Sequence, residues 1–360
     1  MPFEKLPNQE PNQEQRKKEL LELGAEEREL REKIKNEMMW MFAIRYDLIR
    51  GMYDKLRTRG IGETATLTEG YATSAPELDK EAKQELRGAS PNVSYFLKTS
   101  AGGPKSKYGD RNEDAFFLDI KKKIGDEDSD EETMGIFDGM GGMGNGVLAS
   151  RIAVATGLRH ITYGGVKDFE KISKAISRDI NTYGLGGAAT GVIAHFEDSA
   201  KEFSPKMGGG RYVNIMAAGD TKALTIRNGE VFQEGTTVLQ NVAFEYDKGA
   251  GDFYTAKTLS MVTNSFGGHR PIQAQIFRFK PEANDVIVVA TDGLWDNISE
   301  HEIIELLKSA GPKFEEELYN LAYQRNNAED PFQIKHSPAK TVEKKLKTGD
   351  NITLGVMRIK

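Results

Sequence analysis

The chain has 360 residues, of which 38% are hydrophobic and 29% are charged, a composition typical of a globular protein with a polar surface. Its formal net charge of −6 disfavours general binding to nucleic acid, and the absence of cysteine excludes disulfides, thiolate zinc sites and cysteine nucleophiles. No apolar stretch approaches the roughly 18 residues that a membrane-spanning helix needs, and the N-terminal segment lacks the apolar core of a secretion signal. We therefore expect a cytoplasmic protein with no nucleic-acid or membrane partner.

The first 92 residues differ from the rest of the chain in composition and in the spacing of their apolar residues. Residues 1–12 contain three prolines and are expected to form a disordered lead. From 13 to 59, apolar residues recur at mixed steps of three and four, which predicts a helix without strict heptads. We expect this helix to dock on its own domain or to bridge two copies of the chain. Residues 60–92 are rich in Gly, Thr, Ser and Ala and predict a linker with one short helix from Pro76 to Leu86.

From Val93 onward, short apolar runs separated by glycine and acidic clusters predict strands. Strands and helices do not alternate regularly, which favours antiparallel sheets with helices packed outside over a doubly wound parallel sheet. Residues 212–218 and 222–227 are expected to pair as a hairpin, and the acidic run Asp126–Glu132 is expected to be a solvated hairpin tip. Further strands are predicted at 93–98, 114–120, 133–138, 189–196, 274–279, 285–291 and 351–359, and helices at 147–162, 168–181, 299–309 and 313–324.

Acidic residues stand at the ends of four apolar runs. A strand that stops on a carboxylate and turns through glycine holds a charge at the rim of a sheet, where backbone can approach a ligand closely. Oxygen ligands, with no cysteine and no adjacent histidine, suit magnesium or manganese better than zinc. The four places are Asp138–Gly139 after 134–137, Asp292–Gly293 after 286–290, Asp350–Asn351 before 352–359, and Glu113–Asp114 before 115–118.

Two other interpretations of the glycine-rich turn after Asp138 are weaker. The G-x-G-x-x-G pattern of 139–144 matches a dinucleotide fingerprint, but Asp138 would repel the pyrophosphate and no βαβ alternation follows. A phosphoryl-accepting Asp138, as in aspartate-based phosphatases, would need a second Asp two residues on, where Met140 stands. A third interpretation assigns all four acidic places to one site, in which two divalent cations about 4 Å apart share one carboxylate and one water. Such a site activates water for in-line attack on phosphorus.

Six motifs occur in a particular order along the chain. They are N-E-D-A-F-F (112–117), F-D-G-M-G-G (137–142), G-G-A-A-T-G-V (186–192), A-A-G-D-T-K (217–222), A-T-D-G-L-W-D (290–296) and G-D-N-I-T (349–353). In these motifs the chain resembles the metal-dependent protein phosphatases, the type 2C serine/threonine class, in a bacterial-like form. The resemblance implies an α+β fold, a four-layer αββα sandwich of two antiparallel sheets flanked by helices. With it, the chain divides into a disordered lead (1–12), a helical extension with a linker (13–92) and a phosphatase domain (93–360).

The resemblance also implies an activity and the residues that carry it. The activity is hydrolysis of phosphoserine and phosphothreonine in protein substrates by a water bridged between two Mn²⁺ or Mg²⁺ ions. Asp138 is implied as the bridging ligand and Gly139 as a carbonyl ligand. Asp292 and Asp350 are implied as the other direct ligands. The supporting residues are implied to be Glu113 and Asp114, which would hold metal-bound waters, and Asn351, which would steady them.

The chain departs from the family's pattern at several positions. Gly109 stands where a phosphate-binding Arg is usual, so Arg111 or Lys107 is expected to bind the phosphate instead. Met140 and Met143 stand in the turn where the family often carries a histidine that is proposed as a general acid. A third ion lacks a clear ligand, because Asn181 and Leu185 occupy the region where the family places an Asp, and Asp179 is only the nearest acid.

These departures leave two further hypotheses open. One is a pseudophosphatase or regulatory binding module that keeps the fold and has weak or no catalysis. The other is a phosphatase of small phosphorylated metabolites, which shares the chemistry and differs only in the substrate groove. The sequence alone does not separate it from a protein phosphatase.

Overall fold

The computed structural model describes eleven stretches of the chain. The predicted lead, N-terminal helix and most of the linker lie outside them, as do Lys107, Gly109 and Arg111. None of the helices within these stretches is long and apolar enough to cross a membrane. The described residues are 84–102, 112–121, 130–140, 145–163, 168–184, 186–199, 210–244, 259–268, 270–328, 330–344 and 349–360.

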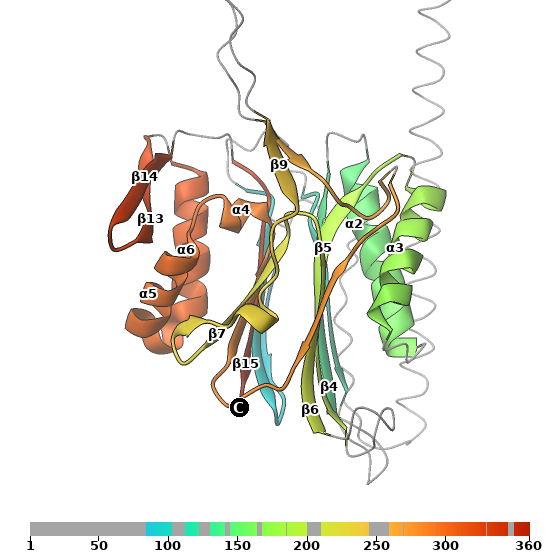
Figure 1. Cartoon of the computed structure of the whole chain (residues 1–360), viewed down its shortest axis with the longest axis horizontal. Coiled ribbons are helices and arrows are strands. Elements are labelled where there is room, and N and C mark those ends of the chain that lie inside the picture. The colour runs from blue at the N-terminus through green and yellow to red at the C-terminus, as the bar shows by residue number, and fades with distance from the viewer. Residues whose placement is uncertain are drawn as a thin grey trace, which may run out of the picture. The chain divides into compact units, whose positions relative to one another are not determined.

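Two antiparallel sheets lie face to face (Figure 1). The six-stranded sheet has the order β1-β2-β15-β12-β7-β8, and the five-stranded sheet has the order β11-β6-β5-β4-β3. In the first, the strands are β1 (Gln84–Ala89), β2 (Val93–Ser100), β15 (Ile352–Ile359), β12 (Val286–Ala290), β7 (Lys222–Arg227) and β8 (Glu230–Val231). In the second, they are β11 (Gln275–Phe279), β6 (Gly210–Ala218), β5 (Ala189–Ser199), β4 (Asp130–Gly139) and β3 (Ala115–Lys121).

Helices cover the outer faces of both sheets, so the predicted α+β sandwich is confirmed. The helices α2 (Gly146–Leu158) and α3 (Phe169–Tyr183) lie outside the five-stranded sheet, with a π-helical turn (Arg159–Tyr163) after α2. The helices α4 (Asp292–Trp295), α5 (Glu300–Ala310) and α6 (Phe314–Asn326) lie outside the six-stranded sheet. Smaller elements are the 3₁₀ turns Gln233–Gly235 and Gly311–Lys313, and the strand pairs β9 (Asn241–Phe244) with β10 (Leu259–Val262) and β13 (Phe332–Ser337) with β14 (Lys340–Lys344).

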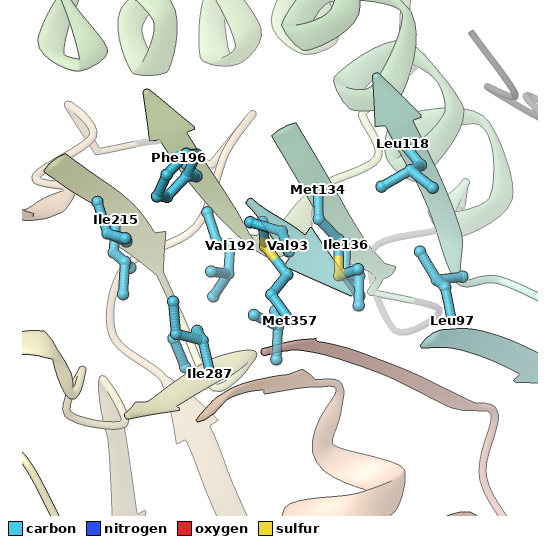
Figure 2. Close-up of a cluster of buried hydrophobic side chains, with 14 of the residues drawn as sticks. Val93, Leu97, Leu118, Met134, Ile136, Val192, Phe196, Ile215, Ile287 and Met357 are labelled. Carbon is cyan, nitrogen blue, oxygen red and sulfur yellow. The ribbon is translucent and has the colours of Figure 1, made fainter. Parts of the chain in front are cut away.

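Among the described residues, two apolar cores hold these layers together. The first lies between the sheets, where Met134, Ile136 and Phe196 of one sheet face Ile287 and Met357 of the other (Figure 2). The second lies between the six-stranded sheet and helices α4 to α6. Strand β12 contributes alternate side chains to both cores, and all five of its residues are buried. Burial on both faces explains why its sequence, VIVVA, is an unbroken apolar run and does not alternate with polar residues.

Local sequence signals fix the ends of two helices. Ser299 and Glu302 form a capping box at the start of α5, in which each side chain accepts a hydrogen bond from the other residue's backbone N–H at 3.2 Å. The Asp168 side chain accepts from the Lys171 N–H at 3.1 Å and caps α3.

The predicted hairpin between 212–218 and 222–227 is wrong. β6 and β7 belong to different sheets, and the chain crosses from one sheet to the other at Gly219 and Asp220. Gly219 has a φ of +91°. Its N–H donates to the side-chain Oε1 of Gln240 at 3.0 Å, and its carbonyl accepts from the Gln240 N–H at 2.8 Å, so a later loop occupies the groups that a hairpin turn would use.

Two further expectations need correction. Residues 84–86 belong to strand β1, which pairs with β2, and do not end a helix, so the six-stranded sheet begins before Val93. The end of the acidic run is not solvated, because Glu131 and Glu132 lie in β4 and are buried. The Glu132 carboxylate accepts a hydrogen bond from the Ser90 hydroxyl, a partner that the sequence pattern did not reveal.

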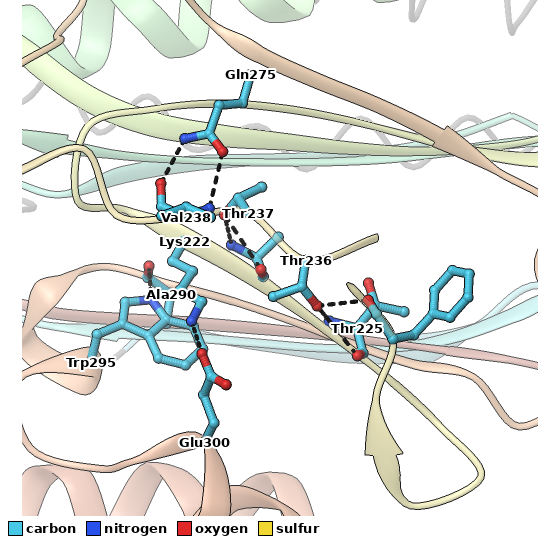
Figure 3. Close-up of polar contacts among 11 residues, drawn as sticks. Lys222, Thr225, Thr236, Thr237, Val238, Gln275, Ala290, Trp295 and Glu300 are labelled. Atoms are coloured by element: carbon cyan, nitrogen blue, oxygen red, sulfur yellow. Dashed lines mark hydrogen bonds and ion pairs between the residues drawn. The ribbon is translucent and has the colours of Figure 1, made fainter. Parts of the chain in front are cut away.

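The segment 232–240 ties the two sheets together along one side (Figure 3). The Thr237 hydroxyl accepts from the Ala223 N–H of β7 at 2.9 Å. The Gln275 amide of β11 bonds both backbone groups of Val238, at 3.0 and 2.6 Å. Thr225 of β7 donates to the Gly235 carbonyl at 2.6 Å. This segment therefore links a strand of each sheet through hydrogen bonds.

We expect Gly135→Ala to destabilise the fold through the Phe117 ring. A Cβ at Gly135 would lie 2.2 Å from Cε1 of this ring, which stacks on Phe137 at a centroid distance of 6.5 Å. The expected loss in free energy of unfolding is about 1–3 kcal/mol, the usual cost of overpacking. Denaturant unfolding of the variant in the wild-type and Phe117→Leu backgrounds measures it. The smaller Leu should recover part of the loss, and an equal loss in both backgrounds would contradict the ring contact as its cause.

Candidate active site

The four acidic places predicted from the sequence lie where neighbouring strands begin or end. β3 and β4 are antiparallel neighbours, so Asp114, just before β3, lies beside Asp138, near the end of β4. In the other sheet β12 and β15 are antiparallel neighbours, so Asp292 follows β12 where Asp350 precedes β15. In an antiparallel pair the end of one strand adjoins the start of the next, which gathers these residues at the same end of the strands in each sheet.

Hydrogen bonds across the sandwich join these strand ends of the two sheets. The Glu113 N–H donates to Asn351 Oδ1 at 2.7 Å, and the Thr353 hydroxyl donates to Asp114 Oδ2 at 2.7 Å. These contacts connect the segment before β3 with the segment that opens β15. The strand ends that carry the carboxylates in the two sheets therefore form one site at one end of the sandwich.

Glycines let the backbones of this site approach closely. A Cβ at Gly293 would lie 2.0 Å from the Asn351 carbonyl oxygen, and a Cβ at Gly139 would lie 2.2 Å from the Gly146 carbonyl oxygen. The Gly139 N–H also donates to the Glu113 carbonyl at 3.2 Å. A larger residue at 139 would push the segment that carries Asp138 away from Gly146, and one at 293 would push the segment that carries Asp292 away from Asn351.

Side chains from helices fix the backbone that carries the carboxylates. Asn326, at the end of α6, donates from Nδ2 to the Asp350 carbonyl at 2.7 Å and accepts from the Asp350 N–H at 3.1 Å. Ser150 of α2 donates to the Glu113 carbonyl at 2.5 Å. These bonds place Asp350 and Glu113 relative to the helical layers on opposite sides of the sandwich.

The short helix α4, which begins with Asp292, is anchored by Trp295. The indole Nε1 donates to the Ala290 carbonyl at 2.6 Å, and Lys222 Nζ lies 5.4 Å from the centre of the ring. Lys222 also pairs with Glu300 of α5 (Figure 3). Asp292 thus leaves β12 on a short helix that is held on the sheet.

The electrostatics of the site reflect crowded negative charge. Burial raises the pKa of Asp138 well above its ordinary value, and the nearby Asp114, Asp292, Asp220 and Asp350 raise it further. The pKa of Asp292 is raised in the same way, first by burial and then by Asp350. Asp114 and Asp350 contribute to both shifts, which places side chains from distant parts of the sequence in one electrostatic group.

Asp114 is the most enclosed of these carboxylates, with 6% of its surface exposed. Burial raises its pKa to about 7 against the opposing effect of hydrogen bonds from Thr353 and Thr291. Its Oδ1 atom has no hydrogen-bond partner among the residues that the structure describes. A buried carboxylate oxygen without a partner is costly unless a cation or water completes it.

Two further acids belong to the group and were missed as site residues. Asp220 sits where the chain crosses between the sheets, and its pKa is raised by burial and then by Asp296 and Asp350. Asp296 follows α4 and also raises the pKa of Asp292. The signal for Asp220 was available, because it ends the apolar run of β6 as Asp138 ends that of β4. Asp296 has no comparable signal, since it follows a helical turn.

Asp179, the acid nearest the expected third-metal position, does not join this group. Both oxygens of Asp179 are occupied, Oδ2 by Thr156 and Arg159 and Oδ1 by Arg178, so it does not fit a third-metal ligand. Met140 donates its N–H to the Ala188 carbonyl at 2.9 Å. The expected phosphate-binding residues Lys107 and Arg111 lie outside the described stretches.

The donor set fits hard divalent cations. Within the described residues, no three Asp, Glu or His side chains lie close enough together to hold an ion by themselves. Magnesium keeps several of its waters in proteins, so a few carboxylates around hydrated ions suffice. The excess negative charge at Asp138 and Asp292, and the unpartnered Oδ1 of Asp114, are features that bound cations and their waters would relieve.

Comparison with known proteins gives matches in sequence and in structure, although no family model matches the chain. A probable protein phosphatase 2C 71 of Oryza sativa subsp. japonica is 25% identical over 210 residues, covering 57% of this chain and 37% of that protein. A probable protein phosphatase 2C 62 of Arabidopsis thaliana is 24% identical over 134 residues, covering 37% of this chain and 15% of that protein. The matches therefore span less than two thirds of either relative.

Among solved structures, a bacterial serine phosphatase superposes with a TM-score of 0.50 at 17% identity. The match covers 74% of this chain and 97% of that one, and it supports the sandwich fold. The sequence matches to two type 2C phosphatases and the shared fold point the same way. The predicted resemblance of this chain to the metal-dependent protein phosphatases of type 2C is thus confirmed in sequence and in fold.

Proposed function

We propose that this chain hydrolyses phosphoserine and phosphothreonine in proteins, with two Mn²⁺ or Mg²⁺ ions bound among its clustered carboxylates. The observation that carries the proposal is the gathering of acidic residues from four segments at neighbouring strand ends, where Asp350 helps to raise the pKa values of Asp114, Asp138 and Asp292. The names of the sequence relatives, both probable type 2C protein phosphatases, support the choice of substrate class.

Each residue has a proposed role that follows from its place. Asp138 lies near the end of β4 beside Asp114, and the charges of Asp114 and Asp292 raise its pKa, so it is the proposed bridging ligand. Asp292, Asp350 and the Gly139 carbonyl are the proposed outer ligands. Two bound divalent cations would lower the pKa of a shared water and screen the charge of the incoming phosphate.

The remaining residues would orient water and substrate. Buried Glu113 and Asp114 are proposed to accept hydrogen bonds from the hydrating waters, and Asn351 Oδ1 fixes Glu113 by accepting from the Glu113 N–H. The reaction breaks the P–O bond of the phosphoester and consumes one water, and it yields the serine or threonine hydroxyl and inorganic phosphate. Lys107 and Arg111 remain the proposed contacts to the phosphate.

We expect Mn²⁺-dependent hydrolysis of para-nitrophenyl phosphate and of a phosphothreonine peptide, abolished by chelator. Asp138→Asn should lower kcat by about 100-fold or more, because it removes charge from the bridging position. Asp198→Asn is the matched control. Asp198 lies near the end of β5 that is far from Asp138, which is opposite Thr190 at the start of β5, and it pairs with Arg211 at 3.0 Å. Equal activity of wild type and Asp138→Asn would contradict the proposal, and tight Mn²⁺ binding without turnover would favour the regulatory module.

Without metal, Asp114 should make stability fall as pH rises. Its pKa is about 7 in the folded chain and about 3.9 when unfolded, so the folded chain binds the extra proton between these values. This contribution to stability is present below about pH 4 and is lost as pH rises to about 7, at about 1.4 kcal/mol per pH unit at most. Chelated wild type should therefore lose stability relative to Asp114→Asn over this interval.

Urea unfolding at a series of pH values, with chelator, measures this difference, and added Mn²⁺ at pH about 7.5 should raise the stability of the wild type. Parallel pH profiles for wild type and Asp114→Asn would show that the carboxylate is not held in a crowded, buried position.

A further inference from the structure

We infer that Thr291 and Thr353 are positioning residues that fix one oxygen of Asp114 and leave the other directed to the ions' hydrating waters. The inference rests on the proposed function, because it assigns a task to Asp114 in the metal site. Neither threonine carries charge, and neither is proposed to touch the ions or the phosphate. Their role follows from the direction of the hydrogen bonds beneath the carboxylate group.

Both hydroxyls converge on a single carboxylate atom. Thr353 Oγ1 donates to Asp114 Oδ2 at 2.7 Å, and Thr291 Oγ1 donates to the same atom at 3.0 Å. The two threonines belong to the two neighbouring strand segments that carry Asp292 and Asp350. Both are fully buried, so no bulk water competes for these bonds.

The donors behind these hydroxyls have fixed directions. Asn112 Oδ1 accepts from the Asp114 N–H at 3.0 Å, so its Nδ2 is the group that donates to Thr99 Oγ1 at 2.9 Å. Thr353 gives its only hydroxyl proton to Asp114, so at the 2.7 Å contact with Thr99 it accepts and Thr99 donates. The order of donation is therefore Asn112, Thr99, Thr353 and Asp114.

Thr291 is constrained in the same way. Its Oγ1 accepts from the Thr353 N–H at 3.0 Å, which leaves its hydroxyl proton for Asp114. All of these donors thus point toward Oδ2, an arrangement that favours the ionised carboxylate and fixes its rotation. Oδ1 is left without a hydrogen-bond partner among the described residues and is available to accept a hydrogen bond from a water molecule among the clustered carboxylates.

The test removes a hydroxyl while keeping the shape of the side chain. Thr353→Val deletes the central donor, Thr353→Ser keeps it, and Thr225→Val is the matched control. Thr225 is also a fully buried threonine in a strand of the same sheet, and its hydroxyl donates to the Gly235 carbonyl, away from Asp114. Thr291→Val repeats the test at the second hydroxyl if Thr353→Val does not fold.

Two measurements on each full-length variant decide the outcome. Calorimetric titration with MnCl₂ should show affinity reduced about tenfold or more in Thr353→Val, and close to wild type in Thr353→Ser and Thr225→Val. Crystals of the metal-free proteins should show the Asp114 carboxylate rotated in Thr353→Val only. Both valine variants are expected to lower Tm, so Tm alone does not separate positioning from packing.

The outcomes distinguish this inference from the proposed function. An unrotated Asp114 in metal-free Thr353→Val, or an equal loss of Mn²⁺ affinity in Thr225→Val, would overturn the positioning role. Wild-type protein that binds no Mn²⁺ would overturn the proposed function, and the inference with it, whatever the orientation of Asp114. Reduced affinity with a rotated carboxylate supports both.

Discussion

Repulsion among carboxylates at one end of the sandwich is the constraint on which this structure depends. Burial and neighbouring carboxylates raise the pKa values of Asp114, Asp138 and Asp292, and Asp350 contributes to each of these shifts, an arrangement that costs free energy in the metal-free chain. A fold tolerates such crowding when its remaining structure determines those positions and a ligand offsets the charge. The rest of the domain can be understood as the frame that holds these groups in place.

The frame has two parts with different tasks. The apolar cores between the sheets and beneath α4 to α6 stabilise the fold through hydrophobic packing, and the site's carboxylates are not part of them. Close to the carboxylates, backbone positions are set by polar groups and glycines. Asn326 holds Asp350 from α6, Ser150 holds Glu113 from α2, and Gly293 allows β15 to approach α4. Loss of stability and loss of the site are therefore expected to have separate mutational causes.

Much of this arrangement could be predicted from the sequence, and the errors share a physical cause. The predicted strands and the four helices from Val93 onward are confirmed, because apolar periodicity reports burial locally. The hairpin between β6 and β7 was wrong because the hydrogen bonds of Gly219 go to Gln240, a non-local partner. Buried Glu132 and the clustering of Asp220 likewise depend on contacts between distant segments. The metal-binding roles remain predictions.

The most direct test of the central claim is the anomalous scattering of manganese in crystals of the full chain grown with MnCl₂. The account predicts manganese peaks beside Asp138, with Asp292, Asp350 and the Gly139 carbonyl among their nearest protein oxygens. Manganese bound elsewhere, with these carboxylates facing only solvent at a saturating concentration, would contradict it.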